Sequence, residues 1–86
     1  MTQISGLWRL DAFFESHPPV DHNTRVIVTV WVMSLLDDAR PVEAAESRDP
    51  ILGPVLRAIV GGTDVEVTYR VLSTGSPRLL SVRRMP

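Results

Sequence analysis

The chain has 86 residues, a formal net charge of −1, 44% hydrophobic residues and no cysteine. This length allows one domain, residues 1–86, and this apolar content excludes a disordered chain. The lack of cysteine excludes disulfides and thiolate metal sites, which fits a reducing compartment. The longest nearly unbroken apolar run, residues 26–33, is too short to span a bilayer, which needs about 20 residues. Because Arg9 and Asp11 interrupt any signal-peptide core, we expect a cytoplasmic protein.

Charge is unevenly distributed along the chain. Residues 1–50 carry four arginines and eight acidic side chains, a net charge of −4. Residues 51–86 carry five arginines and two acidic side chains, a net charge of +3. Such asymmetry can mark a surface that binds nucleic acid or an acidic partner. The alternative is a solvated sheet face whose charges protect its edges from pairing.

The first predicted elements are short. Residues 3–9 have the apolar content of a strand, although Gly6 weakens that assignment. Asp11 is a suitable N-cap for a short helix over residues 12–16, which the following Pro-Pro step would end.

Two principles conflict over residues 21–40. The β-branched valines and isoleucine favour a strand, whereas the length and the capping-type residues Asp21, Asn23 and Thr24 favour a helix. The residues alone leave the choice open. A helix would place one stripe along Val26, Val30, Met33 and Asp37, with Ile27, Trp31 and Leu35 beside it.

Polar residues that could carry chemistry lie between these elements. His17 and His22 have no further ligand at a recognised metal spacing, so we expect exposed side chains and no metal site. Asp37 and Asp38 follow the possible helix and are expected on the surface. Residues 41–50 are polar and bounded by prolines, which predicts a surface loop with at most one helical turn.

Three consecutive antiparallel strands are predicted after this loop, over residues 55–60, 64–72 and 78–84. In the middle run apolar residues alternate with polar ones, which is the pattern of a strand with one buried face. Gly61 and Gly62 supply the positive backbone angles of a tight hairpin, and Gly75 with Pro77 suits a longer loop. The rest of the chain must cover the apolar face of these strands.

The order of the elements and three segments resemble the RelE/ParE superfamily of toxins from bacterial toxin–antitoxin modules. LDAFFESHPPVD resembles the family's first helix and the turn before its second helix. LGPVLRAIVGGTDVEVTYRVL resembles a strand, a tight turn and a strand with a "YRV" ending, and PRLLSVRRM resembles the last strand. The resemblance covers nearly the whole chain and favours the helix over residues 21–40. It implies an α+β fold of order β-α-α-β-β-β, with two N-terminal helices on one face of a small twisted, mainly antiparallel sheet.

The resemblance also implies a function, that of the toxin in a type II toxin–antitoxin module. Such a toxin inhibits growth by ribosome-dependent cleavage of messenger RNA, needs no metal or cofactor, and is neutralised by a cognate antitoxin. In members that cleave RNA, basic residues on the open sheet face hold phosphates while a ribose 2′-hydroxyl attacks the next phosphorus. Planar, permanently charged guanidinium groups suit that task. The candidate catalytic residues are Arg57, Arg70, Arg83 and Arg84, and the candidate nucleic-acid-binding residues are Arg70, Arg78, Arg83 and Arg84.

Side-chain alternation separates two neighbours within this set of strands. Arg70 should point away from the helices, whereas Tyr69 should lie on their side as part of the core. Trp8 and Trp31 are expected as core anchors or as partner-binding residues, because aromatic residues are enriched at interfaces. We expect the antitoxin to lay a helix or strand along an apolar groove beside the helices or along a sheet edge.

The chain also departs from the family pattern. Gly61, Gly62 and Glu66 stand where active nucleases often have basic residues, and no tyrosine or histidine follows Arg84. The net charge of −1 is unusual for a protein that must enter a ribosome, since phosphates supply most of the affinity for nucleic acid. The alternative is a non-catalytic, ParE-like inhibitor of DNA gyrase or another protein target, or an inactive family member that only binds its antitoxin.

Overall fold

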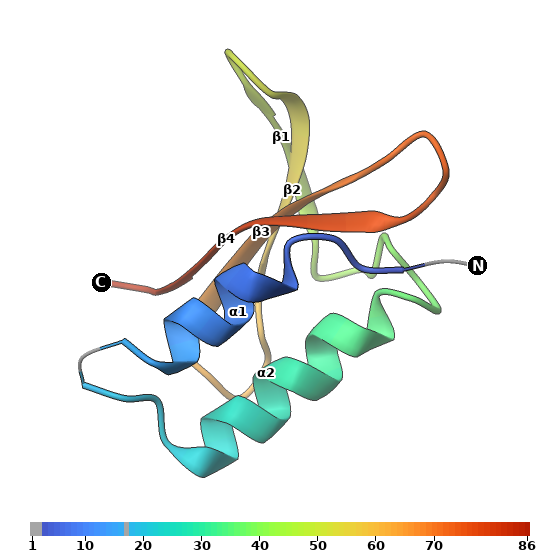
Figure 1. Cartoon of the computed structure of the whole chain (residues 1–86). Helices are drawn as coiled ribbons and strands as arrows, with labels where there is room; N and C mark the ends of the chain where they lie inside the picture. The colour runs from blue at the N-terminus through green and yellow to red at the C-terminus, as the bar shows by residue number, and fades with distance from the viewer. Residues whose placement is uncertain (1–2, 17) are drawn as a thin grey trace.

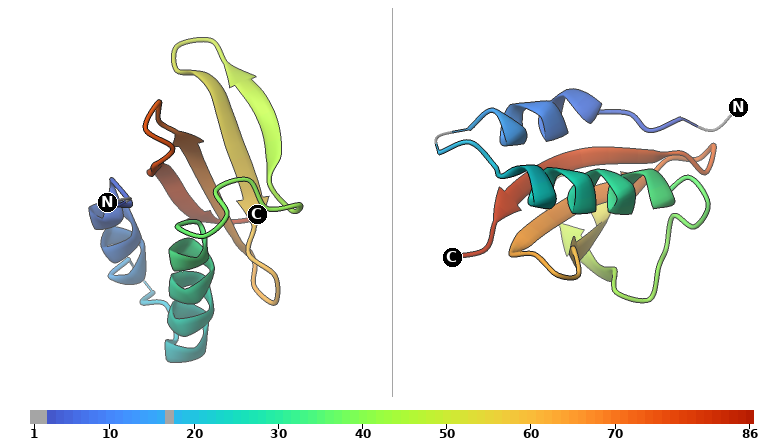
Figure 2. Two further views of the ribbon diagram at one scale, coloured as in Figure 1. Left: turned by 90° about the vertical axis from the view of Figure 1, so that its right-hand side faces the viewer. Right: turned by 90° about the horizontal axis from the view of Figure 1, so that it is seen from below.

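The computed structural model describes residues 3–16 and 18–86. Its four strands pair antiparallel in chain order, and both helices lie on the same face of the sheet (Figures 1 and 2). This is the expected α+β class, but the order is α-α-β-β-β-β because the first strand is absent and another strand precedes the predicted three. The elements are α1 (Leu7–Phe14), α2 (His22–Ser34), β1 (Ala45–Asp49), β2 (Gly53–Ile59), β3 (Val65–Val71) and β4 (Pro77–Arg84).

The predicted first strand is wrong: residues 3–9 form a single bridge and then the start of α1. Ser5 makes a parallel bridge to Arg78 of β4, and its carbonyl oxygen accepts the Leu79 N–H at 2.9 Å. Gly6 then takes a left-handed conformation, with φ of 78°, and serves as the N-cap of α1. Asp11 therefore lies inside the helix and does not cap it. The buried residues of α1 are Leu10, Phe13 and Phe14.

A helix within residues 21–40 is confirmed as α2. Its N-cap is Asp21, and it ends at Ser34, so residues 35–40 lie beyond it. One carboxylate oxygen of Asp21 accepts the Thr24 N–H at 3.1 Å, and the other accepts the Thr24 hydroxyl at 2.6 Å. This cap satisfies one backbone N–H group that a strand would have paired with a neighbour. The buried residues are Val28, Val32 and, just beyond the helix, Leu35. The apolar stripe of Val26, Val30 and Met33 faces outward instead, with Val30 65% exposed.

The predicted loop over residues 41–50 is also corrected, because β1 lies within it. β1 pairs with β2 from Ala45 opposite Arg57 to Asp49 opposite Gly53. Four of its five side chains are exposed, so no buried face produces an alternating pattern in its sequence. One carboxylate oxygen of Asp49 closes the hairpin by accepting the backbone N–H groups of Ile51 at 2.8 Å and Leu52 at 2.9 Å.

The other three strands are confirmed with ends that shift by at most two residues. Gly62, with φ of 82°, turns the hairpin between β2 and β3, and Val60 N–H donates to the Val65 carbonyl across it at 2.9 Å. The predicted core position of Tyr69 is confirmed, because the residue is completely buried. The helices and the inner face of the sheet enclose a single cluster of buried residues: Leu10, Phe13, Phe14, Val20, Val28, Val32, Leu35, Leu56, Val60, Val65, Val67, Tyr69 and Leu79. Among the described residues, no helix has the length and apolarity to cross a membrane.

Candidate nucleic-acid interface

The outer side of the sheet, away from the helices, is uncovered and carries most of the predicted arginines. We call it the open face. Because residues directly opposite each other in an antiparallel pair point to the same side, the register assigns each side chain to a face. Arg57 of β2 lies opposite Thr68 of β3, which lies opposite Ser81 of β4. The centre of the open face thus presents one guanidinium and two hydroxyl groups in a row.

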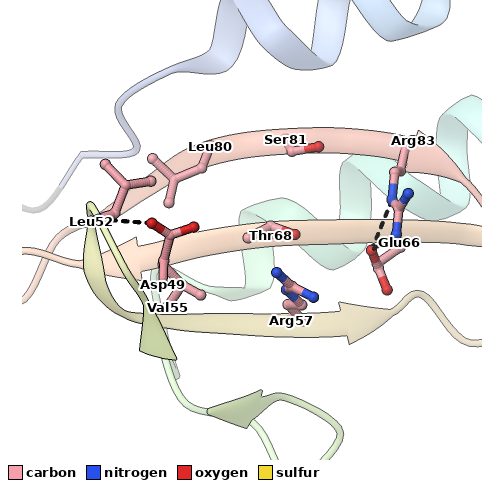
Figure 3. Close-up of a pocket in the computed structure, with 9 residues that line it drawn as sticks. All are labelled: Asp49, Leu52, Val55, Arg57, Glu66, Thr68, Leu80, Ser81 and Arg83. Atoms are coloured by element: carbon pink, nitrogen blue, oxygen red, sulfur yellow. Dashed lines mark hydrogen bonds and ion pairs between the residues drawn. The ribbon is translucent and has the colours of Figure 1, made fainter. Parts of the chain in front are cut away.

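A hollow of about 390 Å³ occupies this face (Figure 3). Arg57, Glu66 and Arg83 gather at one end of it, and Asp49 lies with Leu52 and Leu80 at the other. Val55 of β2 lines the apolar end and is 2% exposed, although it is not on the helix side. The hollow therefore combines an apolar floor with two arginines and two carboxylates. Its lining residues are Asp49, Leu52, Val55, Arg57, Glu66, Thr68, Leu80, Ser81 and Arg83.

Glu66 and Arg83 form the one ion pair that the described residues make on this face. The Nε and one terminal nitrogen of Arg83 each approach the same oxygen of Glu66 at 3.0 Å. The two residues lie directly opposite each other on β3 and β4. The carboxylate therefore compensates the charge of Arg83, so this arginine is less available to an anion than the others.

A second cross-strand pair has like charges. Arg70 of β3 lies directly opposite Arg78 of β4, on the same side as Thr68 and therefore away from the helices, as predicted. Neither arginine forms an ion pair with a described residue. The Nε of Arg70 is buried and has no hydrogen-bond partner within residues 3–16 and 18–86. An uncompensated pair of cations is costly, so this part of the open face favours an anion. The buried Nε of Arg70 is costly as well, but it is not accessible to a ligand on the surface.

The predicted arginines do not all share this face, and Arg84 is the exception. The register of β3 and β4 shifts at Thr68 and Tyr69, so that Leu80 is left without a partner. Beyond this bulge, Arg84 lies opposite Val65, which is fully buried on the helix side. The expectation that Arg84 joins Arg57, Arg70, Arg78 and Arg83 is therefore corrected.

Few groups on the open face could transfer a proton. Hydrogen bonds from the Leu52 and Ile51 N–H groups lower the pKa of Asp49, which makes it a weak base. Tyr69 points to the helix side, and burial raises its pKa to about 12. His22 is the first residue of α2, away from the sheet's open face, and His17 lies outside the described residues. Glu66 is the other carboxylate that lines the hollow, and one of its two oxygens already binds Arg83.

The two tryptophans differ in their surroundings. Trp8 is 63% exposed, so it is not a core anchor, and the Arg9 guanidinium lies 4.4 Å from the centre of its ring. Trp31 is half-buried against the core, meets Tyr69 edge to face, and donates its Nε1–H to a Glu43 carboxylate oxygen at 2.9 Å. Trp31 also borders an apolar groove of about 400 Å³, whose other lining residues are Ile27, Val30, Ser34, Glu43, Ile59, Val60 and Gly61.

Two features of the site were not predicted from the sequence. The hydroxyl groups of Thr68 and Ser81 emerge only from the register, and Asp49 reaches the hollow only because β1 pairs with β2. Alternation along β4 would place Ser81 on the open face only if the bulge at Leu80 were known. Among the described residues, no three histidine, cysteine, aspartate or glutamate side chains cluster as they would around a metal ion.

Comparison of the chain with protein-family models, with curated proteins and with solved structures gave no match.

Proposed function

We propose that the protein is a small RelE/ParE-type toxin whose open face binds the phosphate backbone of messenger RNA and which a cognate antitoxin neutralises. The observation that carries the proposal is the set of Arg57, Arg70 and Arg78 on one uncovered face, without ion pairs to described residues. Guanidinium groups bind phosphate oxygens bidentately and keep their charge at every working pH. Two helices on the other face of the sheet leave this surface free, which agrees with the fold that the resemblance implies.

Cleavage of the RNA would use the same face. The attacking 2′-oxygen forms a bond to phosphorus as the bond from phosphorus to the 5′-oxygen breaks. Arg57, Arg70 and Arg78 would stabilise the negative charge on the phosphate in the transition state. Glu66 would accept the proton of the 2′-hydroxyl, and water would protonate the departing 5′-oxygen. This reaction needs no metal ion or cofactor.

A second candidate is a non-catalytic toxin of the ParE type, which binds DNA gyrase or another protein target. The observation that favours it is the position of the groups that transfer protons. Tyr69 is buried on the helix side, and Glu66 is already bound to Arg83. On this alternative the open face binds an acidic protein surface and no RNA is cut.

The outer side of α2 is the surface that we assign to the antitoxin. Val26, Val30 and Met33 are exposed there, while Val28 and Val32 are buried on the inner side. A helix that is apolar on both sides is normally covered on both. The apolar groove beside Trp31 continues this surface toward the hairpin between β2 and β3. An amphipathic antitoxin helix would fill it, bury the exposed valines and raise the melting temperature of the toxin.

This assignment can be tested by co-purifying the protein with the product of the gene adjacent to that of the protein. Val30→Glu places a charge at the centre of the apolar stripe and should abolish the complex. Val42→Glu is the matched control, because Val42 is completely exposed and lies outside α2. If both variants retain the partner, the antitoxin does not bind on α2.

The toxin itself is tested by inducing the chain alone in bacteria while growth is followed and new messenger RNA ends are mapped. Arrest with cuts inside translated codons supports RNA cleavage, and arrest without cuts supports the protein target. An Arg70→Ser/Arg78→Ser variant should restore growth in either case. Arg48→Ser is the control, since Arg48 lies on the edge strand β1 and has no ion pair with a described residue. Normal growth with the wild-type chain would contradict the proposal.

A further inference from the structure

A second groove lies between α1 and β4 and meets the open face at β4. We call it the Trp8 groove. It has a volume of about 530 Å³, and three of its lining side chains are arginines, whereas none is acidic. The chain segment at Ser5 pairs only with the start of β4. The rest of β4 is an open edge of the sheet, and the groove is accessible along it. The lining residues are Trp8, Arg9, Ala12, Phe13, Ser16, Leu80, Ser81, Val82, Arg83 and Arg84.

Trp8 is the aromatic residue of this groove, and packing of the core does not account for its position. The neighbouring residues Leu10, Phe13 and Phe14 bury themselves against the sheet, whereas Trp8 remains 63% exposed. The Arg9 guanidinium lies over its ring at 4.4 Å, which is a cation–π contact that orients the indole. No other aromatic ring among residues 3–16 and 18–86 stacks on Trp8. A large flat ring is thus presented to the groove beside cationic groups.

The Trp8 groove is continuous with the hollow on the open face across β4. Leu80, Ser81 and Arg83 line both. Side chains of β4 alternate between the two sides of the sheet. The bulge at Leu80 shifts this alternation by one residue, so Arg83 points to the open face and Arg84 to the helix side. A chain of phosphates bound on the open face could therefore pass over the edge of β4 and remain beside arginines.

We propose that the Trp8 groove holds an unstacked base of single-stranded RNA, which stacks on the Trp8 indole while Arg9 and Arg84 neutralise the adjacent phosphates. Single-stranded RNA is typically recognised in this way, by aromatic rings that stack on splayed bases next to a basic track for the backbone. An acidic peptide would satisfy the arginines but would leave the indole without a stacking partner. The inference rests on the proposed RNA-binding function and adds a base-binding subsite to it.

The test is titration of the full chain with a fluorescently labelled single-stranded RNA, followed by anisotropy. A second titration uses the same sugar–phosphate chain without its bases. Trp8→Leu should weaken binding of the intact RNA about 10-fold, which corresponds to the loss of one stacked base. Trp8→Phe, which keeps a stacking ring, should restore most of the affinity. The RNA without bases should bind the wild type and Trp8→Leu with similar affinities. Leu7→Ala is the control, because Leu7 is also exposed on α1 and does not line the groove.

The outcomes separate this inference from the proposed function. If Trp8→Leu binds intact RNA like the wild type while Arg70→Ser/Arg78→Ser binds weakly, the base subsite is wrong and the open-face interface stands. If the wild type binds no RNA, both are wrong. If instead a polyglutamate peptide binds and quenches Trp8 fluorescence in a Trp31→Phe background while RNA does not, the groove is a site for acidic protein segments and the inference is overturned.

Discussion

Arg70 and Arg78 face each other directly across β3 and β4, and neither forms an ion pair with a described residue. Like charges at such positions destabilise a sheet. The protein therefore retains an arrangement that costs stability on the surface where an anion would bind. Sites that bind ligands commonly show this conflict, because the ligand supplies the missing charge.

Replacing Arg78 with threonine should reveal that conflict. The variant loses the repulsion, so its free energy of unfolding in urea should rise by about 0.5 kcal/mol. Its affinity for single-stranded RNA should fall, and the dependence of binding on salt should become shallower, because one phosphate contact is lost. The same substitution at Arg48 should change neither property. Loss of stability in Arg78→Thr would show that the arginine is held by a favourable contact.

Replacing Glu66 with glutamine should distinguish the two candidate functions. The change releases Arg83, which is bound to Glu66 at 3.0 Å, and so RNA should bind more tightly. If Glu66 accepts the proton of the 2′-hydroxyl, cleavage should nevertheless disappear. The Arg83 side chain is 58% exposed but that of Glu66 only 13%, and the glutamine can still accept a hydrogen bond from Arg83, so the loss of stability should be about 1 kcal/mol. Cleavage at the wild-type rate in this variant would exclude Glu66 as the base.

Gly6 is a position where substitution should destabilise the fold without touching the open face. Its φ of 78° is strained for any other residue, and a Cβ atom there would lie 2.6 Å from the Leu79 carbonyl oxygen. Gly6→Ala should therefore lower the free energy of unfolding by about 2 kcal/mol. Gly61→Ala is the control, because nothing lies within 4 Å of its added Cβ and its φ is not positive. Equal stability of the two variants would contradict the packing of α1 against β4.

Tyr69 should give the protein an alkaline limit. Its hydroxyl donates to the Ala39 carbonyl at 2.7 Å, and burial raises its pKa from 10.0 to about 12. Because the folded-state pKa is the higher one, this contribution is complete below pH 10 and is lost as the pH rises toward 12. No other side chain should titrate there, since the chain has one tyrosine, no cysteine, and only arginines among its lysine and arginine residues.

The matching variant is Tyr69→Phe, studied by urea unfolding between pH 8 and pH 12. It should be about 1 kcal/mol less stable than the wild type at pH 8, because the Ala39 carbonyl loses its donor. It should also lack the alkaline decline. A decline of equal size in both proteins would mean that Tyr69 ionises as easily in the folded chain as in the unfolded one.

The elements that the sequence predicted are those with one buried face or a specific cap. Alternation identified β3, and Asp21 marked the start of α2. β1 was missed because four of its side chains are exposed, which leaves no period in its sequence. The start of α1 depends on the conformation of Gly6 against Leu79, a contact between distant parts of the chain. The residues themselves do not encode that contact in any local pattern.

The sequence predicted the basic character of the candidate site better than it predicted which side chains share one face. Arginines in the last strands indicated a basic surface, and Arg70 lies on the face expected for it. The bulge at Leu80 shifts the register by one residue, which reverses the face of every side chain after it. That shift puts Arg83 on the open face and Arg84 beside α1. A sequence with two adjacent arginines does not reveal which of them faces the ligand.

The most direct test of the central claim is an NMR titration of the isotope-labelled chain with a short single-stranded RNA at low salt. The claim predicts that the side-chain Nε–H signals of Arg57, Arg70 and Arg78 shift together and that added salt reverses the shifts. Backbone signals of Thr68 and Ser81 should move with them. Shifts confined to Val26, Val30 and Met33 of α2, or no shifts at all, would contradict the claim that the open face binds RNA.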